Sequence, residues 1–423
     1  MVNTFIIPVP IVDTNKIFDY RLVITKPVAV MNGYYLVFFN LLSLSFLFLS
    51  ILSGCNKNVS NLPLIEQHYD LYRSEEGGLK DIFESVELIP LQYKEQESYP
   101  SSVSKFLAQD SLILVADNKN LIHVFDKEGT FISSSANIRG EGPGEVSIIN
   151  SFTYDPNTKS IAILTPFKIM EYDNFFNFIN EYPIPSRIKS KNQSELLFNK
   201  IDRISDNYIL FTNTRDGKSL RFMKFNKESH ETEDEIEYSD KIFGFGSFQN
   251  KNFFNIESQS AIFIPTALCN QIFLYDYKKN SLTPIVSFSL GEKESKPDEF
   301  NSFKNINQAA NDFLKSNKEV VVRVLPNNEY IIFMTKSGDN LKTFANYVVN
   351  RRTGDIRKIL MFEDGKMISP MFQDIDSDYV YAIMEKENLI EAPILLMDKV
   401  EDLNSIEDES LVVLKYKFKS LLD

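Results

Sequence analysis

The chain has 423 residues, of which 43% are hydrophobic and 24% are charged, a composition typical of a soluble globular protein. Its formal net charge is −13, which argues against nucleic acid as a partner, because phosphate binding needs a concentrated basic surface. With two cysteines and three histidines, the chain has few soft ligands, so a zinc or iron site is not expected.

The first strongly apolar segment runs from Tyr34 to Leu52 and is followed at once by Ser53-Gly54-Cys55. An apolar core that ends in small residues is typical of a secretory signal. The sequence Leu-Ser-Gly-Cys resembles the lipobox of bacterial lipoproteins, which implies lipidation of the Cys55 sulfur and cleavage before Cys55. Buried acyl chains contribute about 0.8 kcal/mol per methylene, so several of them anchor a protein durably. The alternative is an uncleaved transmembrane helix, for which the segment barely reaches the ~20 residues required.

The N-terminal region is therefore divided into a signal region over residues 1–54 and a polar tether over residues 55–84. Residues 1–30 do not resemble the start of a signal, and Met31 opens a segment of ordinary signal length. This favours the hypothesis that Met31 is the true start and that residues 1–30 are an upstream extension. Against it, no basic residue lies between Met31 and the apolar core, whereas basic residues lie upstream.

Short apolar segments recur six times in the rest of the chain, with their central residues 48, 48, 52, 70 and 48 positions apart. Each is followed by a second segment that ends in a polar turn, as at residues 122–129. Four strands in about 50 residues is the repeat of a propeller blade. The sequence therefore predicts an all-β fold, a six-bladed β-propeller of four-stranded antiparallel blades over residues 85–423, rather than a solenoid. The central residues of the repeats are Leu114, Ala162, Leu210, Ile262, Ile332 and Val380.

The long fourth step contains an insertion whose apolar residues recur at three- and four-residue spacing. This spacing predicts one amphipathic helix near residues 295–316, packed on a face or edge of the propeller. Before the first full repeat, residues 86–91 form a strand-like segment. We expect this segment to join the C-terminal strands in the last blade, because ring closure removes exposed sheet edges.

A glycine-rich run follows the first repeat, and it lacks the features of a phosphate-binding loop. It has no Lys-Ser/Thr ending, and a glutamate stands where a dinucleotide motif has its third glycine. We interpret it as a turn between blades, with glycines at positive φ and a stiffening proline. The alternative is a ligand-facing rim that carries the three charged residues of the run. The run comprises Arg139, Gly140, Glu141, Gly142, Pro143, Gly144 and Glu145.

Together with residues 125–132 and 87–91, this run resembles the six-bladed β-propeller lipoproteins of Bacteroidetes, relatives of the NHL-repeat propellers. The resemblance covers about residues 85–418 in layout, but it is close in motif only over residues 112–173. It implies a secreted, membrane-attached propeller of a kind often encoded by glycan-using gut bacteria. It implies no established activity.

The residues after Cys55 include Lys57 but no acidic run. In the Bacteroidetes lipoproteins that this chain resembles, export to the cell surface is associated with acidic residues just after the lipidated cysteine. We therefore expect a lipid anchor in the outer membrane, on its periplasmic face rather than on the cell surface.

Three aspartates alternate at Asp374, Asp376 and Asp378, in a pattern similar to part of a calcium loop. No glycine follows at the sixth position and no glutamate completes the loop, so we interpret the segment as a solvated turn between two strands. A structural calcium ion in the propeller channel remains an open alternative, because ligands there come from dispersed positions. No other cofactor is predicted.

The motifs of common hydrolases are missing from the sequence: it has no Gly-x-Ser-x-Gly, no His-Glu-x-x-His and no paired cysteines. His123 lies within a strand and is expected to be packed, whereas His68 and His230 lie in polar segments. Cys269 is expected to be a buried, inert thiol.

Two hypotheses about function remain. The first is a non-catalytic binding module that uses one propeller face to hold a glycan, a peptide or an envelope protein. The alternative is a metal-assisted hydrolase or lyase that acts on a sugar derivative at the channel. The alternative predicts carboxylates or asparagines that converge at the channel with perturbed pKa values. The side chains that line the channel mouth discriminate between the two.

Overall fold

The computed structural model divides the chain into two units, Met1–Leu64 and Ile65–Asp423. In the first unit it describes one short antiparallel pair, β1 (Val12–Asp13) with β2 (Lys16–Ile17). The predicted lipidation site, Cys55, lies outside the described residues, as does nearly all of the helix predicted over residues 295–316. The described residues are 12–13, 16–17, 67–93, 102–109, 111–184, 198–213, 220–233, 236–238, 250–257, 260–265, 270–295, 313, 315–338, 344–363, 365–397, 399–408 and 410–419.

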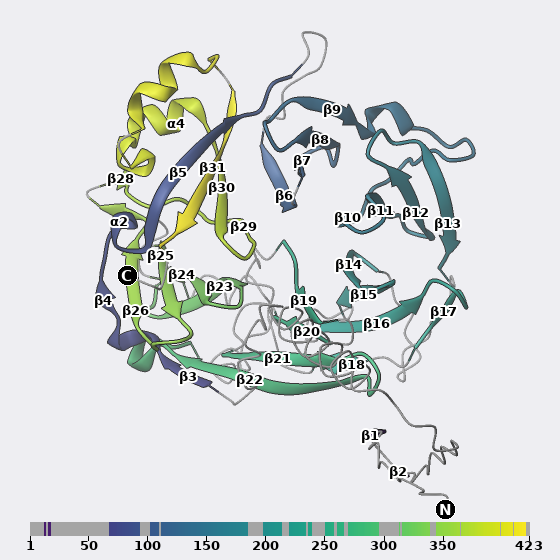
Figure 1. Ribbon diagram of the computed structural model, residues 1–423, viewed down its shortest axis with the longest axis horizontal. Helices are drawn as coiled ribbons and strands as arrows, with labels where there is room; N and C mark the ends of the chain where they lie inside the picture. The colour runs from purple at the N-terminus through teal and green to yellow at the C-terminus, as the bar shows by residue number, and fades with distance from the viewer. Residues whose placement is uncertain are drawn as a thin grey trace, which may run out of the picture. The chain divides into compact units, whose positions relative to one another are not determined.

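The described residues of the second unit form six antiparallel blades arranged in a ring around a channel (Figure 1). Blade 1 contains β6 (Val103–Gln109), β7 (Leu112–Asp117), β8 (Ile122–Asp126) and β9 (Phe131–Ser134). Blade 2 contains β10 (Ser151–Asp155), β11 (Ser160–Leu164), β12 (Lys168–Asp173) and β13 (Phe178–Pro183). Blade 3 contains β14 (Lys200–Ile204), β15 (Asn207–Asn213), β16 (Leu220–Asn226), β17 (Glu231–Thr232) and β18 (Ile236–Tyr238).

The other three blades complete the ring. Blade 4 contains β19 (Phe253–Glu257), β20 (Ser260–Phe263), β21 (Gln271–Asp276) and β22 (Ser281–Ser289). Blade 5 contains β23 (Glu319–Pro326), β24 (Tyr330–Ser337), β25 (Phe344–Asn350) and β26 (Ile356–Leu360). Blade 6 contains β29 (Asp374–Ile375), β30 (Tyr379–Glu385), β31 (Leu411–Phe418) and β5 (Phe83–Pro90). The predicted fold class is confirmed.

The period found in the sequence is that of the second strand of each blade. The six central residues of the repeats lie on β7, β11, β15, β20, β24 and β30. A second strand has a neighbouring strand on both edges and another blade against each face, so its side chains are buried on both sides. Every residue of β7 and of β11 is buried, for example. These strands therefore form continuous apolar runs, which are easier to find in a sequence than alternating ones.

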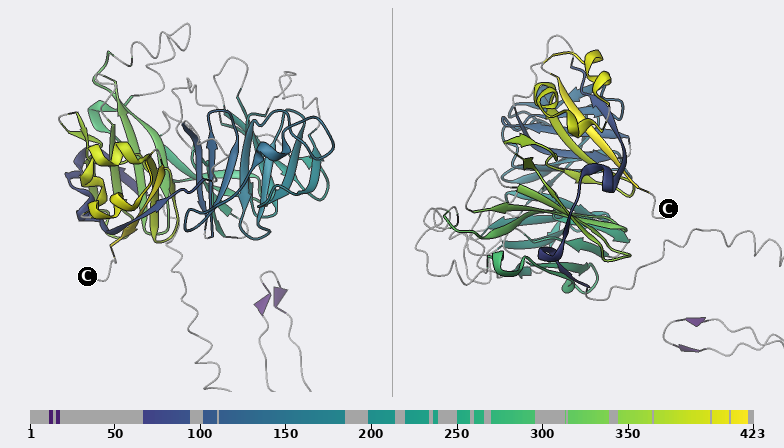
Figure 2. Two further views of the ribbon diagram at one scale, coloured as in Figure 1. Left: turned by 90° about the horizontal axis from the view of Figure 1, so that it is seen from above. Right: turned by 90° about the vertical axis from the view of Figure 1, so that its left-hand side faces the viewer.

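Blades 4 and 5 each carry a fifth strand that the sequence pattern did not predict. β3 (Gln67–Asp70) pairs in parallel with β22, and β4 (Glu75–Glu76) pairs in parallel with β26. The turn η1 (Leu71–Arg73) joins them, and α2 (Leu79–Ile82) leads into β5. This purple segment lies along the outer side of the ring (Figure 2). The compact unit thus begins at Ile65, before the boundary at residue 85 that the sequence suggested.

The ring closes in blade 6, where strands from both ends of the propeller meet. β5 pairs antiparallel with β31, from Val412 opposite Pro90 to Phe418 opposite Phe83. The ion pair of Lys415 with Glu87 (2.9 Å) crosses the same two strands. The prediction that residues 86–91 join the C-terminal strands is confirmed.

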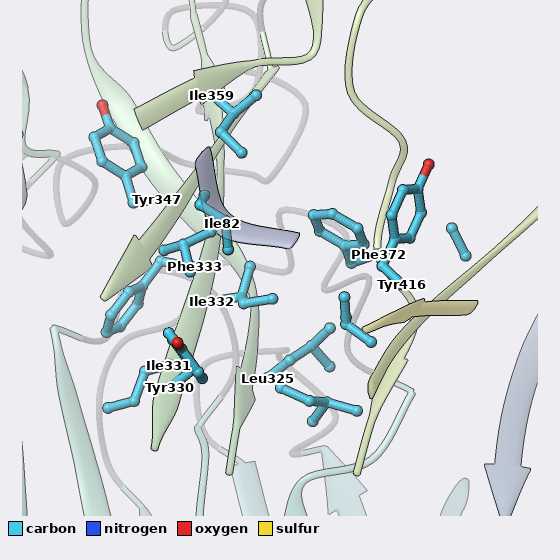
Figure 3. Close-up of a cluster of buried hydrophobic side chains, with 14 of the residues drawn as sticks. Ile82, Leu325, Tyr330, Ile331, Ile332, Phe333, Tyr347, Ile359, Phe372 and Tyr416 are labelled. Carbon is cyan, nitrogen blue, oxygen red and sulfur yellow. The ribbon is translucent and has the colours of Figure 1, made fainter. Parts of the chain in front are cut away.

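Aromatic rings gather where β5 meets blades 5 and 6 (Figure 3). The ring of Phe83 lies 5.6 Å from that of Phe372 and 5.1 Å from that of Tyr416. Tyr330 of blade 5 stacks on Phe418 at 4.3 Å between ring centroids. Closure therefore buries a core that neither end of the chain could bury alone.

Short helical turns occupy the connection between β30 and β31 and the blade junctions. They are η2 (Ser135–Ile138), η3 (Gly291–Lys293), α4 (Lys386–Glu391), η5 (Pro393–Leu396) and η6 (Val400–Ser405), and a hairpin of β27 (Phe362–Glu363) with β28 (Lys366–Met367) precedes blade 6. Among the described residues, no helix has the length and apolar character needed to cross a membrane.

Truncation of Phe83 tests the closure. We expect Phe83→Ala to lower the free energy of unfolding by about 3–5 kcal/mol, because the side chain is 1% exposed and its loss leaves a cavity. Phe175→Ala is the matched control, since that ring is 64% exposed and its removal should change stability by less than about 0.5 kcal/mol. Urea unfolding of both variants gives the comparison. Equal effects would show that the closure contacts do not govern stability.

Candidate functional site

A cavity of about 340 Å³ opens at the end of the channel where the first strands of the blades finish. These innermost strands are β6, β10, β14, β19, β23 and β29, and all of them contribute to its wall. Because they run in the same direction, their C-terminal ends and the turns that follow gather on one face of the ring. The charged and amide side chains of the wall include Lys105, Gln109, Asp155, Asn157, Asp202, Arg203, Lys251, Asn255, Asn327 and Asp376.

Lysines from three blades converge in the channel. Lys105 lies on β6, Lys200 on β14 and Lys251 just before β19, and each is half-buried. The Lys105 ammonium donates a hydrogen bond to the carbonyl of Phe152 in blade 2 and lies 4.7 Å from the centroid of that ring. Lys200 donates to the side-chain oxygen of Asn252 in blade 4.

Burial changes the acidity of this cluster. It lowers the pKa of Lys105 to about 7, because the charged ammonium loses hydration. Asp202 opposes this effect, whereas the positive charges of Lys200 and Lys251 add to it. Burial also lowers the pKa of Lys200. The lysines therefore lie close enough to influence one another's charge.

Two buried carboxylates lie in the same channel. Asp202 accepts hydrogen bonds from the backbone N–H of Asn252 (2.7 Å) and of Phe253 (3.2 Å) in blade 4. Asp374 accepts from the backbone N–H of Ala108 in blade 1 at 2.8 Å. Burial raises the pKa of Asp374 to about 6, although Lys251 and the N–H donors oppose the shift. Each carboxylate thus joins an innermost strand to the next blade.

Other buried polar side chains make similar links. Arg323 of blade 5 donates to the carbonyl of Phe372 at 2.6 Å, at the start of blade 6. Arg203 of blade 3 forms an ion pair with Asp155 of blade 2 at 2.7 Å. Asn250 reaches across the channel from blade 4 to the carbonyl of Phe106 in blade 1 (3.3 Å). These bonds fix the innermost strands relative to one another and make the channel wall rigid.

The donor set of the channel does not fit calcium. Calcium takes six to eight oxygen ligands, usually with several carboxylates among them. Asp202 and Asp374 already accept backbone N–H bonds, and lysines stand beside them. Within the described ranges, no three His, Cys, Asp or Glu side chains are placed to hold a metal ion. We therefore derive no chemistry from a metal here.

The glycine-rich run lies in the connection that leads into β10, whereas the cavity lies at the other end of that strand. Arg139 donates to the carbonyls of Ser147 and Lys119, both at 2.9 Å, and the carboxylate of Glu145 accepts from the backbone of Gly142 at 2.8 Å. Glu141 and Pro143 are exposed. The structure does not bring this run together with the channel cluster.

The glycines of the run differ from the expectation in one respect. Only Gly144 has a positive φ, of 74°, and it lies under the ring of Phe178. Gly140 has no positive φ, and a Cβ there would only have to displace the carboxylate end of the exposed Glu145 side chain, 1.9 Å away.

The three alternating aspartates do not share one environment. Asp378 is exposed and Asp376 is half-buried in the turn between β29 and β30, where it accepts from the Tyr381 hydroxyl at 2.5 Å. Asp374, however, is buried in the channel, so the prediction of a solvated turn is wrong for this residue. The reason is that β29 begins at Asp374 and is the innermost strand of blade 6.

The described histidines lie away from the cavity. His123 is buried, as predicted, with its Nε2 atom 3.8 Å from Asp117, and burial lowers its pKa. His68 contacts Ser287 and Asp70, each at 3.0 Å, and His230 is exposed. Cys269 lies outside the described residues.

Asp374 gives a pH-dependent prediction. Its folded pKa of about 6 lies above the ordinary value of about 3.9, so the folded state binds more protons between these values and loses stability as the pH rises through them. Asp374→Asn removes this titration and keeps one acceptor oxygen. We expect the variant to gain on the order of 1–3 kcal/mol relative to the parent protein between pH 4.5 and pH 7.5.

Urea unfolding of the parent protein and the variant at both pH values measures this change. Asp378→Asn is the control, because that carboxylate is exposed. A stability difference between Asp374→Asn and the parent that stays constant with pH would contradict the assignment.

Two solved structures from Bacteroides share this fold. A protein of Bacteroides fragilis assigned as exported matches with 17% identity and a TM-score of 0.63, over 84% of this chain and 99% of its own. A Bacteroides vulgatus member of the DUF4221 family matches with 12% identity and a TM-score of 0.52, over 80% of this chain and 98% of its own. At these identities the likeness shows the fold alone.

No curated protein matches the chain by sequence. A family model described as a domain of unknown function, DUF4934, matches residues 66–416, a range that spans all six blades and every residue of the cavity wall. The chain therefore belongs to the DUF4934 family.

Proposed function

We propose that this propeller is a binding module and that its ligand occupies the cavity at the channel mouth. The observation that carries the proposal is the convergence of polar side chains from all six innermost strands on one cavity of about 340 Å³. This volume lies at the lower end of the range of small-molecule sites. It favours a compact ligand or the tip of a larger one.

The structure of the wall supports binding. Hydrogen bonds between neighbouring innermost strands, such as those of Asp202 and Arg323, hold the polar groups in place before a ligand arrives. The side chains of a preorganised site lose less conformational entropy when the ligand binds. The turns at the mouth, by contrast, are surface connections, where ligand specificity is easily built on a rigid scaffold.

The enzymatic alternative has one specific observation in its favour. Lys105 and Asp374 lie in the same channel with pKa values of about 7 and about 6, and groups tuned towards neutrality are common in active sites. Both, however, are bonded to backbone groups of neighbouring blades, which gives each a structural role. A base at Lys105 acting on a sugar derivative is therefore the second candidate, without metal assistance.

We also propose that the module is attached to the outer membrane through lipid on Cys55, on the periplasmic face. The lipobox resemblance of residues 52–55 supports this, and so does the Bacteroides fragilis protein of the same fold that is assigned as exported.

The binding proposal is tested with a pair of tryptophan variants. Ser377 is an exposed residue of the cavity wall, and Ser147 is an exposed residue at the opposite end of β10. A panel of neutral and acidic sugars, oligosaccharides and short peptides is screened for thermal stabilisation, because a ligand at 100 times its Kd stabilises by about 2.7 kcal/mol. We expect Ser377→Trp to abolish the response to the compounds found and Ser147→Trp to preserve it.

The reverse pattern would move the site to the other end of the channel. Lack of any response across the panel would refute the binding module, and turnover of a sugar derivative by the parent protein would favour the second candidate.

The anchor is tested with a cysteine pair. In a Bacteroides host fed an alkyne analogue of palmitate, we expect the parent protein and Cys269→Ser to be labelled and Cys55→Ser to be unlabelled and released from membranes. Labelling of Cys55→Ser would contradict the assignment. Protease treatment of intact cells should leave the protein whole, and its rapid loss would place it on the cell surface.

A further inference from the structure

We propose that the ligand of this cavity is a small anion, a carboxylate, sulfate or phosphate on a compact polar body, held by Lys105 and Lys251. The inference rests on the proposed function and adds the chemical class of the ligand. It begins from a contrast of charge. The whole chain carries a net charge of −13, yet cationic side chains gather inside its channel.

Apart from one ion pair, the described charged side chains of the channel and its mouth are four cations and three carboxylates. The cations are Lys105, Lys200, Lys251 and Arg323, and the carboxylates are Asp202, Asp374 and Asp376. The nearby pair of Arg203 and Asp155 is balanced. An excess of positive charge in a partly desolvated channel attracts anions more strongly than the same charges would on an open surface.

The carboxylates of the channel are already used by the backbone. Asp202 accepts two N–H bonds from blade 4, and Asp374 accepts one from blade 1 and one from the N–H of Ile375. Asp376 accepts two N–H bonds within its own turn, from Asp378 and Tyr379. Burial also shifts Asp374 towards its neutral form. Its negative charge is therefore roughly halved at pH 6, and the lysines have less compensation there than at higher pH.

Two of the cations reach the cavity itself. Lys105 and Lys251 line its wall together with the carboxylates of Asp202 and Asp376. Lys200, Arg323 and Asp374 are not among the residues that line it. An ammonium on each side of a cavity of about 340 Å³ can donate charge-assisted hydrogen bonds to one anionic group. Gln109 and Asn255, also in the wall, suit a polar uncharged remainder such as a hydroxyl-bearing ring.

The acidity of Lys105 adds a second, independent signature. The charged groups that face it are Asp202 and Lys200 from β14, Lys251 before β19 and Asp374 from β29. With a pKa of about 7 in the free protein, Lys105 is largely neutral at pH 8, and an anion placed beside it favours the ammonium. Binding should therefore take up a proton and weaken as the pH rises from 6 to 8.

The test measures binding by calorimetry with the full mature chain. The probes are glucuronate, glucose 6-sulfate, glucose 6-phosphate and neutral glucose, together with inorganic sulfate and phosphate. We expect at least one anionic sugar to bind ten-fold or more tightly than glucose, with an affinity that falls between pH 6 and pH 8. The inorganic ions separate a requirement for the anionic group alone from a requirement for the sugar body.

Matched variants locate the site. Lys251→Gln should lower the affinity for the anionic probe at least ten-fold. Lys127 is an exposed lysine in a turn of blade 1, and Lys127→Gln should leave the Kd unchanged. Lys105 also bonds to blade 2, so Lys105→Arg is used to keep the charge and the fold. This variant should still bind the anion, and its affinity should fall less between pH 6 and pH 8 than that of the parent protein, because only the titration of Asp374 remains.

Three outcomes would overturn the anion assignment: equal binding of glucose and the acidic sugars, an unchanged Kd in Lys251→Gln, or failure of every anion to bind. If neutral sugars or peptides still bind and Ser377→Trp still abolishes that response, the binding module stands and only the ligand class is wrong. If no compound of any class binds, the proposed function fails as well.

Discussion

The pairing of β5 with β31 is the constraint on which the rest of the molecule depends. An open arc of blades would leave the faces of its two end blades exposed, because each blade buries its faces only against its two neighbours. Blade 6 receives β29, β30 and β31 from the C-terminal end of the propeller and its outermost strand from residues that precede blade 1. Its core, around Phe83 and Tyr416, is therefore assembled only when both ends of the propeller are in place. The same segment then carries α2, β4 and β3 along the outer edges of blades 5 and 4, which covers strands that would otherwise be exposed.

Closure also determines the environment of the channel. Once the six innermost strands face one another, no further sheet covers their channel side, and most of their side chains there are shielded from bulk water. The polar side chains in the channel form hydrogen bonds with the backbone of the next blade, as Lys105, Asp374 and Arg323 do. A buried charge without such a partner would cost several kcal/mol. The polar channel is thus a structural consequence of the ring as well as a candidate site, and this double role explains why titratable groups with shifted pKa values are found there.

The strands that repeat most regularly could be predicted from the sequence, and the site could not. Second strands such as β7 and β11 form unbroken apolar runs, and the turn residues after them mark the hairpins, so the number of blades and the closure by residues 86–91 follow from local patterns. Lys105, Lys200 and Lys251 lie far apart in the chain and on different blades. Nothing in the local sequence distinguishes any of them from an exposed lysine, because only the closed ring brings the three together. The burial of Asp374 was missed for a related reason: β29 has only two residues, too few for a pattern, and the turn residues after it dominate the local sequence.

The contrast between the surface and the channel bears on how an anion would reach the cavity. At physiological ionic strength, charges more than about 8 Å apart in solvent are largely screened, so the acidic surface repels an approaching anion only weakly. Within the cavity the distances are short and the lysines are half-buried, so salt screens their attraction much less. Raising the salt concentration should therefore remove the long-range repulsion before it weakens the contacts at the site. A site on an exposed basic patch would behave in the opposite way, with affinity falling steeply from the first addition of salt. The position of these lysines, inside the ring and not on its surface, would thus allow a strongly acidic protein to select the anionic ligand that we propose.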